Sequence, residues 1–183
     1  MSPHTVIVCG DTEEELKAPA WAKDYLPPEN EALYLFWPRG LGKRGQWTHK
    51  SPPNTVERSL ALLGQTVDTG RVRDIINVAQ VCKDDTIGTP FGRLVGRGQA
   101  GILAAYAALY VPSVKEVVII DPPASHRDGP TFLNVLRVLD IPEALGMLAP
   151  HVKLTLINGK DKAFDRTAQL YKIAGAEDKF ERK

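Results

Sequence analysis

The sequence predicts an α/β fold with three layers, in which a mostly parallel sheet lies between two layers of helices. Short apolar runs alternate along the chain with segments of helical periodicity, and this order is typical of parallel strands joined by helices. The runs are continuously apolar, as expected for strands covered on both faces. With 183 residues, 43% of them apolar, the chain can bury a real core, and we predict one domain over residues 1–183.

The predicted elements follow one another in a regular order. β-rich runs that end near Gly, Pro or Asp predict strands at Thr5–Cys9, Ala32–Trp37, Arg93–Val95, Glu116–Ile120 and Val152–Ile157, with a short edge strand at Lys179–Arg182. Apolar spacing of three and four residues predicts helices at Val56–Leu63, Gly70–Val81, Gln99–Tyr110, Pro130–Leu139, Pro142–Leu148 and Arg166–Ile173. Asn54 is the expected N-cap of the first of these helices.

Charge and hydropathy exclude two kinds of partner. The formal net charge is +1, and no run of Lys or Arg is suited to follow a phosphate backbone, so nucleic acid is not expected as a partner. The longest apolar stretch, Ile102–Val111, is too short for a membrane-spanning helix. No signal peptide is visible. We therefore expect a cytoplasmic protein, or an exported one if this chain is part of a longer polypeptide.

Cysteine and histidine spacing gives no sign of a metal site. Cys9 and Cys82 do not form a C-x-x-C motif and are expected to be structural thiols. The four histidines share no ligand spacing; they are His4, His49, His126 and His151. No metal and no cofactor are expected from these residues.

The segment Arg93–Ala104 contains the most informative pattern, in which a strand runs through a glycine-rich turn directly into a helix. One interpretation is a nucleophile elbow, the sharp turn that presents the serine of G-x-S-x-G in α/β-hydrolases. Gly98 would then stand where the serine belongs. Glycine adopts a strained turn conformation without the Cβ penalty, so it fits once no hydroxyl is required.

The alternative interpretation is a dinucleotide-binding turn. Gly96, Gly98 and Gly101 form G-x-G-x-x-G, and Asp121 ends the next predicted strand 20 residues after Gly101. Such a turn binds a pyrophosphate of NAD or FAD at the helix N-terminus, and the carboxylate binds a ribose hydroxyl. However, the motif normally opens its fold, whereas two predicted strands precede it here.

The chain as a whole resembles an α/β-hydrolase of the acetyl xylan esterase and prolyl-oligopeptidase-like group. More closely, it is similar to hydrolase-like segments without the serine in large secreted or envelope proteins of planctomycete-type bacteria. The blocks that carry the resemblance are Thr5–Asp11, Leu35–Gly42, Leu62–Asp74, Val95–Gly101, Val118–His126 and Leu154–Asp161. The resemblance implies that the first strands of the fold are missing and that the chain is the later part of a longer fold.

The resemblance also implies roles for individual residues. Gly98 occupies the position of the missing nucleophile, and Asp161 fits the acid of the triad. Gln99 and Gly10 fit the residues whose backbone amides would form an oxyanion hole. No histidine follows His151, so the general base has no match. The expected function is a non-catalytic scaffold or ligand-holding module, with acetylated polysaccharide or another domain of the same polypeptide as partner.

Two alternatives remain open at this stage. The chain could be an active carboxylic-ester hydrolase on acetylated carbohydrate, or a dinucleotide-binding domain that uses Gly96–Gly101. Ser125, His126 and Asp128 lie together in a loop and suggest a displaced catalytic group, but we expect Ser125 and Asp128 to cap a turn before the Pro130 helix. His126 is kept as a weaker catalytic candidate. The loop Trp37–Trp47 could bind a sugar or an anion, or Trp37 could belong to the core.

Overall fold

The computed structural model describes residues 4–10, 17–27, 32–42, 55–81 and 91–183. The strands are β1 (His4–Val8), β2 (Leu33–Phe36), β3 (Phe91–Arg97), β4 (Glu116–Ile120), β5 (Lys153–Ile157) and β6 (Phe180–Arg182). The α-helices are α1 (Thr55–Leu62), α2 (Val67–Val81), α3 (Gln99–Ala108), α4 (Ile141–Gly146) and α5 (Asp165–Ile173). The 3₁₀ helices found in these ranges are η1 (Ala20–Tyr25), η2 (Val135–Arg137), η3 (Lys162–Phe164) and η4 (Glu177–Lys179).

All six strands form one parallel sheet in the order β2-β1-β3-β4-β5-β6, which confirms the predicted fold class. Because the strands are parallel, their carboxyl ends meet along one edge of the sheet. This is the edge where open α/β sheets bind ligands. The register pairs Val8 with Gly96 and Arg97 with Ile120, so the residues just beyond these pairs share that edge.

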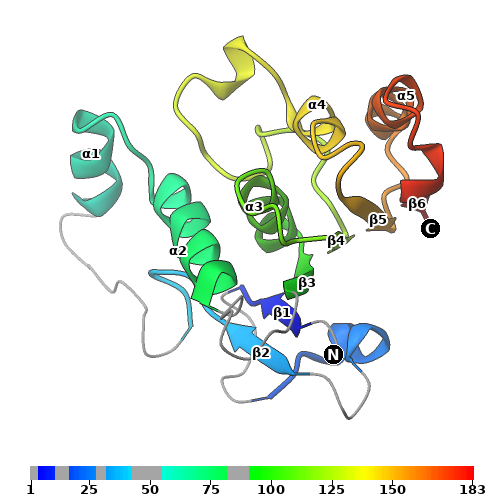
Figure 1. Ribbon diagram of the computed structural model, residues 1–183. Coiled ribbons are helices and arrows are strands. Elements are labelled where there is room, and N and C mark those ends of the chain that lie inside the picture. Colours follow the sequence, from blue (N-terminus) through cyan, green and yellow to red (C-terminus); the bar gives the residue numbers. More distant parts are fainter. Residues whose placement is uncertain (1–3, 11–16, 28–31, 43–54, 82–90) are drawn as a thin grey trace.

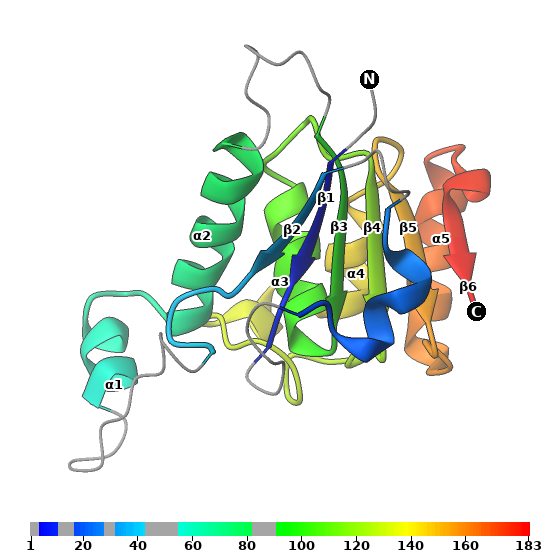
Figure 2. The same ribbon diagram turned by 90° about the horizontal axis from the view of Figure 1, so that it is seen from below.

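The two faces of the sheet are covered unequally. The larger core packs α2, α3, α4 and α5 against one face, and Ile75, Ile102, Leu145 and Tyr171 are fully or almost fully buried there. On the other face, a smaller core around Ile7, Val95 and Val118 is covered by η1 among the described elements. Figures 1 and 2 show this arrangement, with η1 on one side of the sheet and the larger helices on the other.

The helix predicted at Pro130–Leu139 is not formed. This segment is an irregular chain with the single 3₁₀ turn η2, and Asn134 has a left-handed backbone (φ 58°). A left-handed residue interrupts a right-handed helix, even though the apolar spacing favours one. The helix that was expected after the Ser125–Asp128 turn is therefore absent, but the turn itself is present: the Ser125 hydroxyl accepts the Arg127 N–H at 3.2 Å, and the Ser125 carbonyl accepts the Asp128 N–H at 3.1 Å.

Other boundaries shift for local reasons. Helix α2 begins at Val67 rather than Gly70 because Thr66 caps it: the Thr66 hydroxyl accepts from the Thr69 N–H at 3.0 Å. Strand β3 extends further at both ends than predicted, and η1 was not predicted. Asn54, Cys82, His49 and residues 43–47 of the loop that ends at Trp47 lie outside the described residues.

Candidate active site

The bend between β3 and α3 lies at the carboxyl edge of the sheet and is built on Gly98. Its backbone dihedrals are φ 57° and ψ −129°, a conformation that residues with a side chain adopt only under strain. The Gly98 N–H donates to the Ile120 carbonyl at 2.8 Å, and the Gly98 carbonyl accepts the Ile102 N–H of the first helical turn at 3.4 Å. A Cβ at Gly98 would have no heavy atom within 4 Å. The position is therefore strained but spacious.

Gly96 and Gly101 are required by the close packing of α3 against the sheet. A Cβ on Gly96 would lie 2.6 Å from the Gly101 nitrogen. A Cβ on Gly101 would collide with Ile119 Cγ2 and would lie 2.7 Å from the Gly96 oxygen. These contacts explain both glycines through backbone packing, so neither one requires a bound phosphate.

Asp121 follows β4 and is held by two neighbouring strand ends. Its carboxylate accepts from Arg97 Nε at 2.7 Å and from Asn158 Nδ2 at 2.8 Å. The Asn158 hydrogen bond, aided by Arg97 and opposed by partial burial, lowers the pKa of Asp121. Asp121 and Asn158 both have left-handed backbones, with φ 50° and 58°. The carboxylate that the dinucleotide interpretation assigns to a ribose is thus engaged by side chains of this chain.

The residues proposed for an oxyanion hole lie at the same edge. Gly10 is two residues past Val8, and Gly98 is two residues past Gly96, with which Val8 is in register. Gln99 is the first residue of α3 and is exposed; its side-chain amide donates to the Asp128 carbonyl at 3.3 Å. The Gln99 side chain therefore ties the bend to the loop after β4.

Asp161, the candidate acid, lies four residues beyond β5 and is exposed. Its carboxylate accepts the Ala163 N–H at 2.8 Å and so caps the 3₁₀ helix η3. This capping role accounts for an Asp at this position without a catalytic function.

His126 is buried, with 7% of its surface exposed, and both of its ring nitrogens are engaged. Nδ1 lies 2.8 Å from the Pro130 carbonyl, which can only accept, so Nδ1 carries the proton. With a neutral ring, Nε2 then accepts from the Tyr106 hydroxyl at 2.8 Å. Burial, with the Asp140 carboxylate adding to it, raises the pKa of Tyr106 to about 12. His126 therefore has no ring nitrogen available for a substrate in this arrangement.

Ser125 and the backbone of His126 are instead organised by Asp140. The Ser125 hydroxyl donates to Asp140 Oδ2 at 2.6 Å, and the His126 N–H donates to Oδ1 at 2.7 Å. Burial raises the pKa of Asp140, but these bonds and the Ile141 N–H outweigh it, and the pKa is lowered. Asp140 also forms a capping box with Glu143 at the start of α4. The Ser-His-x-Asp sequence is not a catalytic relay, because Ser125 bonds Asp140 rather than His126.

Sequence reasoning did not find Tyr106, Asp140 or Asn158. Asp140 and Glu143 have the spacing of a capping box, so this helix start could have been predicted from the sequence. Tyr106 and Asn158 have no such local signal, since their partners are 20 and 37 residues away. Among the residues of known placement, no three His, Cys, Asp or Glu side chains are grouped to hold a metal ion. None of the helices in the described ranges is long and apolar enough to cross a membrane.

Two of the solved structures with a similar fold are esterases. One is assigned as an acetyl xylan esterase from Bacteroides fragilis, with a TM-score of 0.63 and 15% identity over 98% of this chain and 58% of that one. The other is a carbohydrate esterase family 15 glucuronoyl esterase from Caldicellulosiruptor kristjansonii, with a TM-score of 0.60 and 13% identity over 98% of this chain and 61% of that one. No family model and no curated protein matches the sequence.

The class of fold follows from these similarities. The chain has an α/β fold of the kind found in α/β-hydrolase-type esterases, and it spans about three fifths of the length of those two proteins.

Proposed function

We propose that this chain is a degenerate esterase-type domain that holds a ligand and does not perform acyl transfer through residue 98. The observation that carries the proposal is the bend itself. It keeps the strained backbone and the open space that a nucleophile needs, but Gly98 supplies no nucleophilic atom. Loss of the triad serine alone removes most of the rate of a serine hydrolase, about 10⁶-fold.

The ligand class that we propose is acetylated polysaccharide. One of the two esterases of similar fold supports it, since that protein is assigned as an acetyl xylan esterase. The carboxyl edge of the sheet would bind the sugar beside Gly98, with Gln99 and the exposed Arg97 guanidinium as hydrogen-bonding groups. Another domain of the same polypeptide is the other partner that we consider for this edge.

Catalysis is tested first. Purified protein should show no turnover of p-nitrophenyl acetate above buffer and no labelling by a fluorophosphonate probe. Gly98→Ser should label weakly or not at all, and Gly98→Ala is the matched control because it carries the same backbone strain without a hydroxyl. Serine labelling with turnover by the unmodified chain would favour the alternative, an active carboxylic-ester hydrolase.

Binding is tested separately by thermal unfolding with acetylated xylan oligosaccharides, because a ligand that binds only the folded state raises the melting temperature. Deacetylated oligosaccharides are the ligand control. Gly98→Trp fills the space at the bend and should abolish the shift, whereas Gly98→Ala should keep it. The absence of any shift at millimolar oligosaccharide would contradict the proposed ligand. A shift with NAD or FAD instead would support the dinucleotide interpretation.

A further inference from the structure

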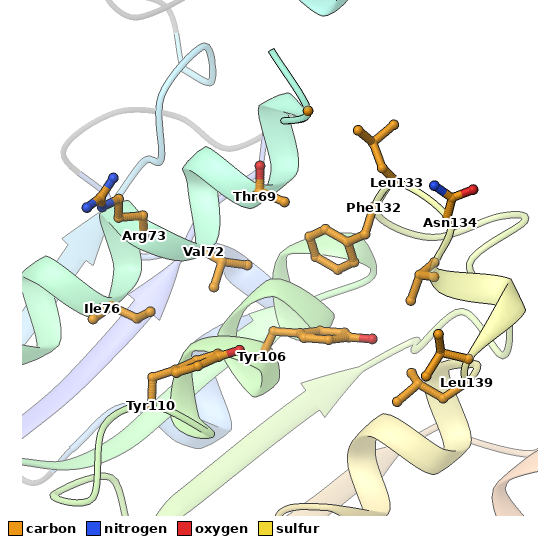
Figure 3. Close-up of a pocket in the computed structure, with 13 residues that line it drawn as sticks. Thr69, Val72, Arg73, Ile76, Tyr106, Tyr110, Phe132, Leu133, Asn134 and Leu139 are labelled. Carbon is orange, nitrogen blue, oxygen red and sulfur yellow. The ribbon is translucent and has the colours of Figure 1, made fainter. Parts of the chain in front are cut away.

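An apolar groove of about 590 Å³ lies away from the bend, between α2, the second half of α3 and the segment after Pro130. Figure 3 shows its walls: Val72 and Ile76 from α2, Tyr106 from α3, Tyr110 from the turn after α3, and the ring of Phe132 between them. Tyr106 is eight residues after Gly98, about 12 Å along the helix. The groove is therefore distinct from the candidate site at the carboxyl edge.

Large apolar side chains at the rim of the groove are exposed to solvent. Tyr110 is 67% exposed, Leu133 44% and Val138 83%. Arg73 is the one charged residue that lines the groove in the described part of the chain, and no ion-pair partner is found for it there. Clustered apolar side chains beside a charge of one sign are typical of an interaction surface.

Helix α1 adjoins the groove and carries an apolar stripe. None of its residues is fully buried; Val56 and Leu60 are half-buried, and Leu63, in the turn after the helix, is 74% exposed. Val56, Leu60 and Leu63 are spaced i, i+4 and i+7, which places them within about 60° of one another around the helix axis. At about 100° per residue, Glu57 flanks this stripe, whereas Arg58 and Leu62 lie on other sides. Gly64, just beyond α1, lines the groove.

The turn after α1 holds this helix away from the groove of its own chain. The Gln65 N–H donates to the Leu60 carbonyl at 2.9 Å, and the Gly64 N–H donates to the Ala61 carbonyl at 3.1 Å. With Gly64 at φ 72°, these bonds form a Schellman motif. Figures 1 and 2 show α1 standing off from the body at the end of α2.

We propose that a second copy of this chain occupies the groove by inserting α1, and that the exchange is reciprocal in a two-fold dimer. The Val56, Leu60 and Leu63 stripe of one copy fits the apolar walls of the other, as amphipathic helices do in apolar grooves. Charge complementarity sets the orientation, because Glu57 at the edge of the stripe meets Arg73 of the other copy, which has no ion-pair partner among the described residues of its own chain. In a two-fold dimer the groove of each copy receives α1 of the other copy. Both grooves and both helices are then covered, and no further copy can add to the assembly.

Sedimentation equilibrium of the full chain tests the proposal. The dimer should dissociate in Leu60→Asp and Leu63→Asp, with the dissociation constant raised about tenfold or more, since buried apolar anchors dominate such interfaces. Leu62→Asp is the matched control. Leu62 and Leu63 are 89% and 74% exposed and adjacent, but Leu62 lies off the stripe, so its variant should remain dimeric. Leu62→Asp and Leu63→Asp should fold, because both side chains are mostly exposed. Leu60 is half-buried, so the melting temperature of Leu60→Asp is measured beside its dissociation constant, and Leu63→Asp decides the test if Leu60→Asp does not fold.

A charge-reversal cycle tests the orientation. Glu57→Arg and Arg73→Glu should each raise the dissociation constant about two- to fivefold, and the double variant should restore it. Arg58→Glu should leave it unchanged. Two results would overturn the proposal. One is a chain that stays monomeric up to about 0.5 mM, on the order of the dissociation constant of a weak dimer. The other is an equal rise of the dissociation constant in Leu62→Asp and Leu63→Asp. Binding of an aromatic dye to a monomeric chain would overturn it also, in favour of a small ligand.

Discussion

Gly98→Ala is the sharpest test of the bend, because it adds strain without adding a clash. The new Cβ would meet no heavy atom within 4 Å, so only the φ 57°, ψ −129° backbone opposes it. A residue with a side chain in such a conformation costs about 1–3 kcal/mol. Reduced freedom of the unfolded chain offsets about 0.4–1 kcal/mol of this. The free energy of unfolding should therefore fall by about 1–2 kcal/mol, or a few degrees in melting temperature.

Urea unfolding of three variants separates strain from packing. Gly64→Ala is the control for an open left-handed glycine, since its φ is 72° and its Cβ also has no neighbour within 4 Å. Gly64→Ala should cost about 1 kcal/mol. Gly96→Ala should cost more than either, because its Cβ would lie 2.6 Å from a backbone nitrogen that cannot move freely. If Gly98→Ala were neutral and Gly96→Ala no worse than Gly64→Ala, the account of the bend would be refuted.

Three further results are expected. Asp140→Ala removes the acceptor for the Ser125 hydroxyl and for two backbone N–H groups, so urea unfolding should show a loss of about 2–4 kcal/mol. Tyr106→Phe leaves Nε2 of His126 buried without its donor and should cost about 1–3 kcal/mol, with a changed His126 imidazole signal by NMR. Asp121 and Asp140 have lowered pKa values, so their stabilisation is complete above the ordinary carboxyl pKa of about 3.9 and is lost as the pH falls through their lower folded values. The stability difference between the unmodified chain and Asp121→Asn should accordingly shrink as the pH is lowered from about 5 to about 2. A difference that did not change with pH would contradict this assignment.

The parallel sheet and the glycine bend could be predicted from the sequence, because both depend on local chemistry. Continuous apolar runs such as residues 117–120 of β4 are typical of strands covered on both faces. A turn from strand to helix at Gly98 follows from the spacing of Gly96 and Gly101 around it. The role of the bend does not follow from the same spacing, since dinucleotide-binding folds and hydrolases share this strand-turn-helix arrangement.

The errors arise where distant contacts override local periodicity. Phe132, Val135, Leu136 and Leu139 have helical spacing, but Phe132 packs on the rings of Tyr106 and His126 instead. Asn134 then turns the chain through a left-handed conformation. The Arg97, Asp121 and Asn158 interactions join three strand ends, and single-sequence patterns hold no information on pairs so far apart.

The contrast between α1, which buries no residue, and α3, which buries eight of its ten, implies that the chain does not unfold uniformly. Amide protons of α3 should exchange with solvent only through global opening, whereas those of α1 should exchange through local fraying at a small fraction of that free energy. A protease added under native conditions should therefore cut near α1 first and leave a folded remainder. Any partner that covers α1 should be detectable as protection confined to that helix.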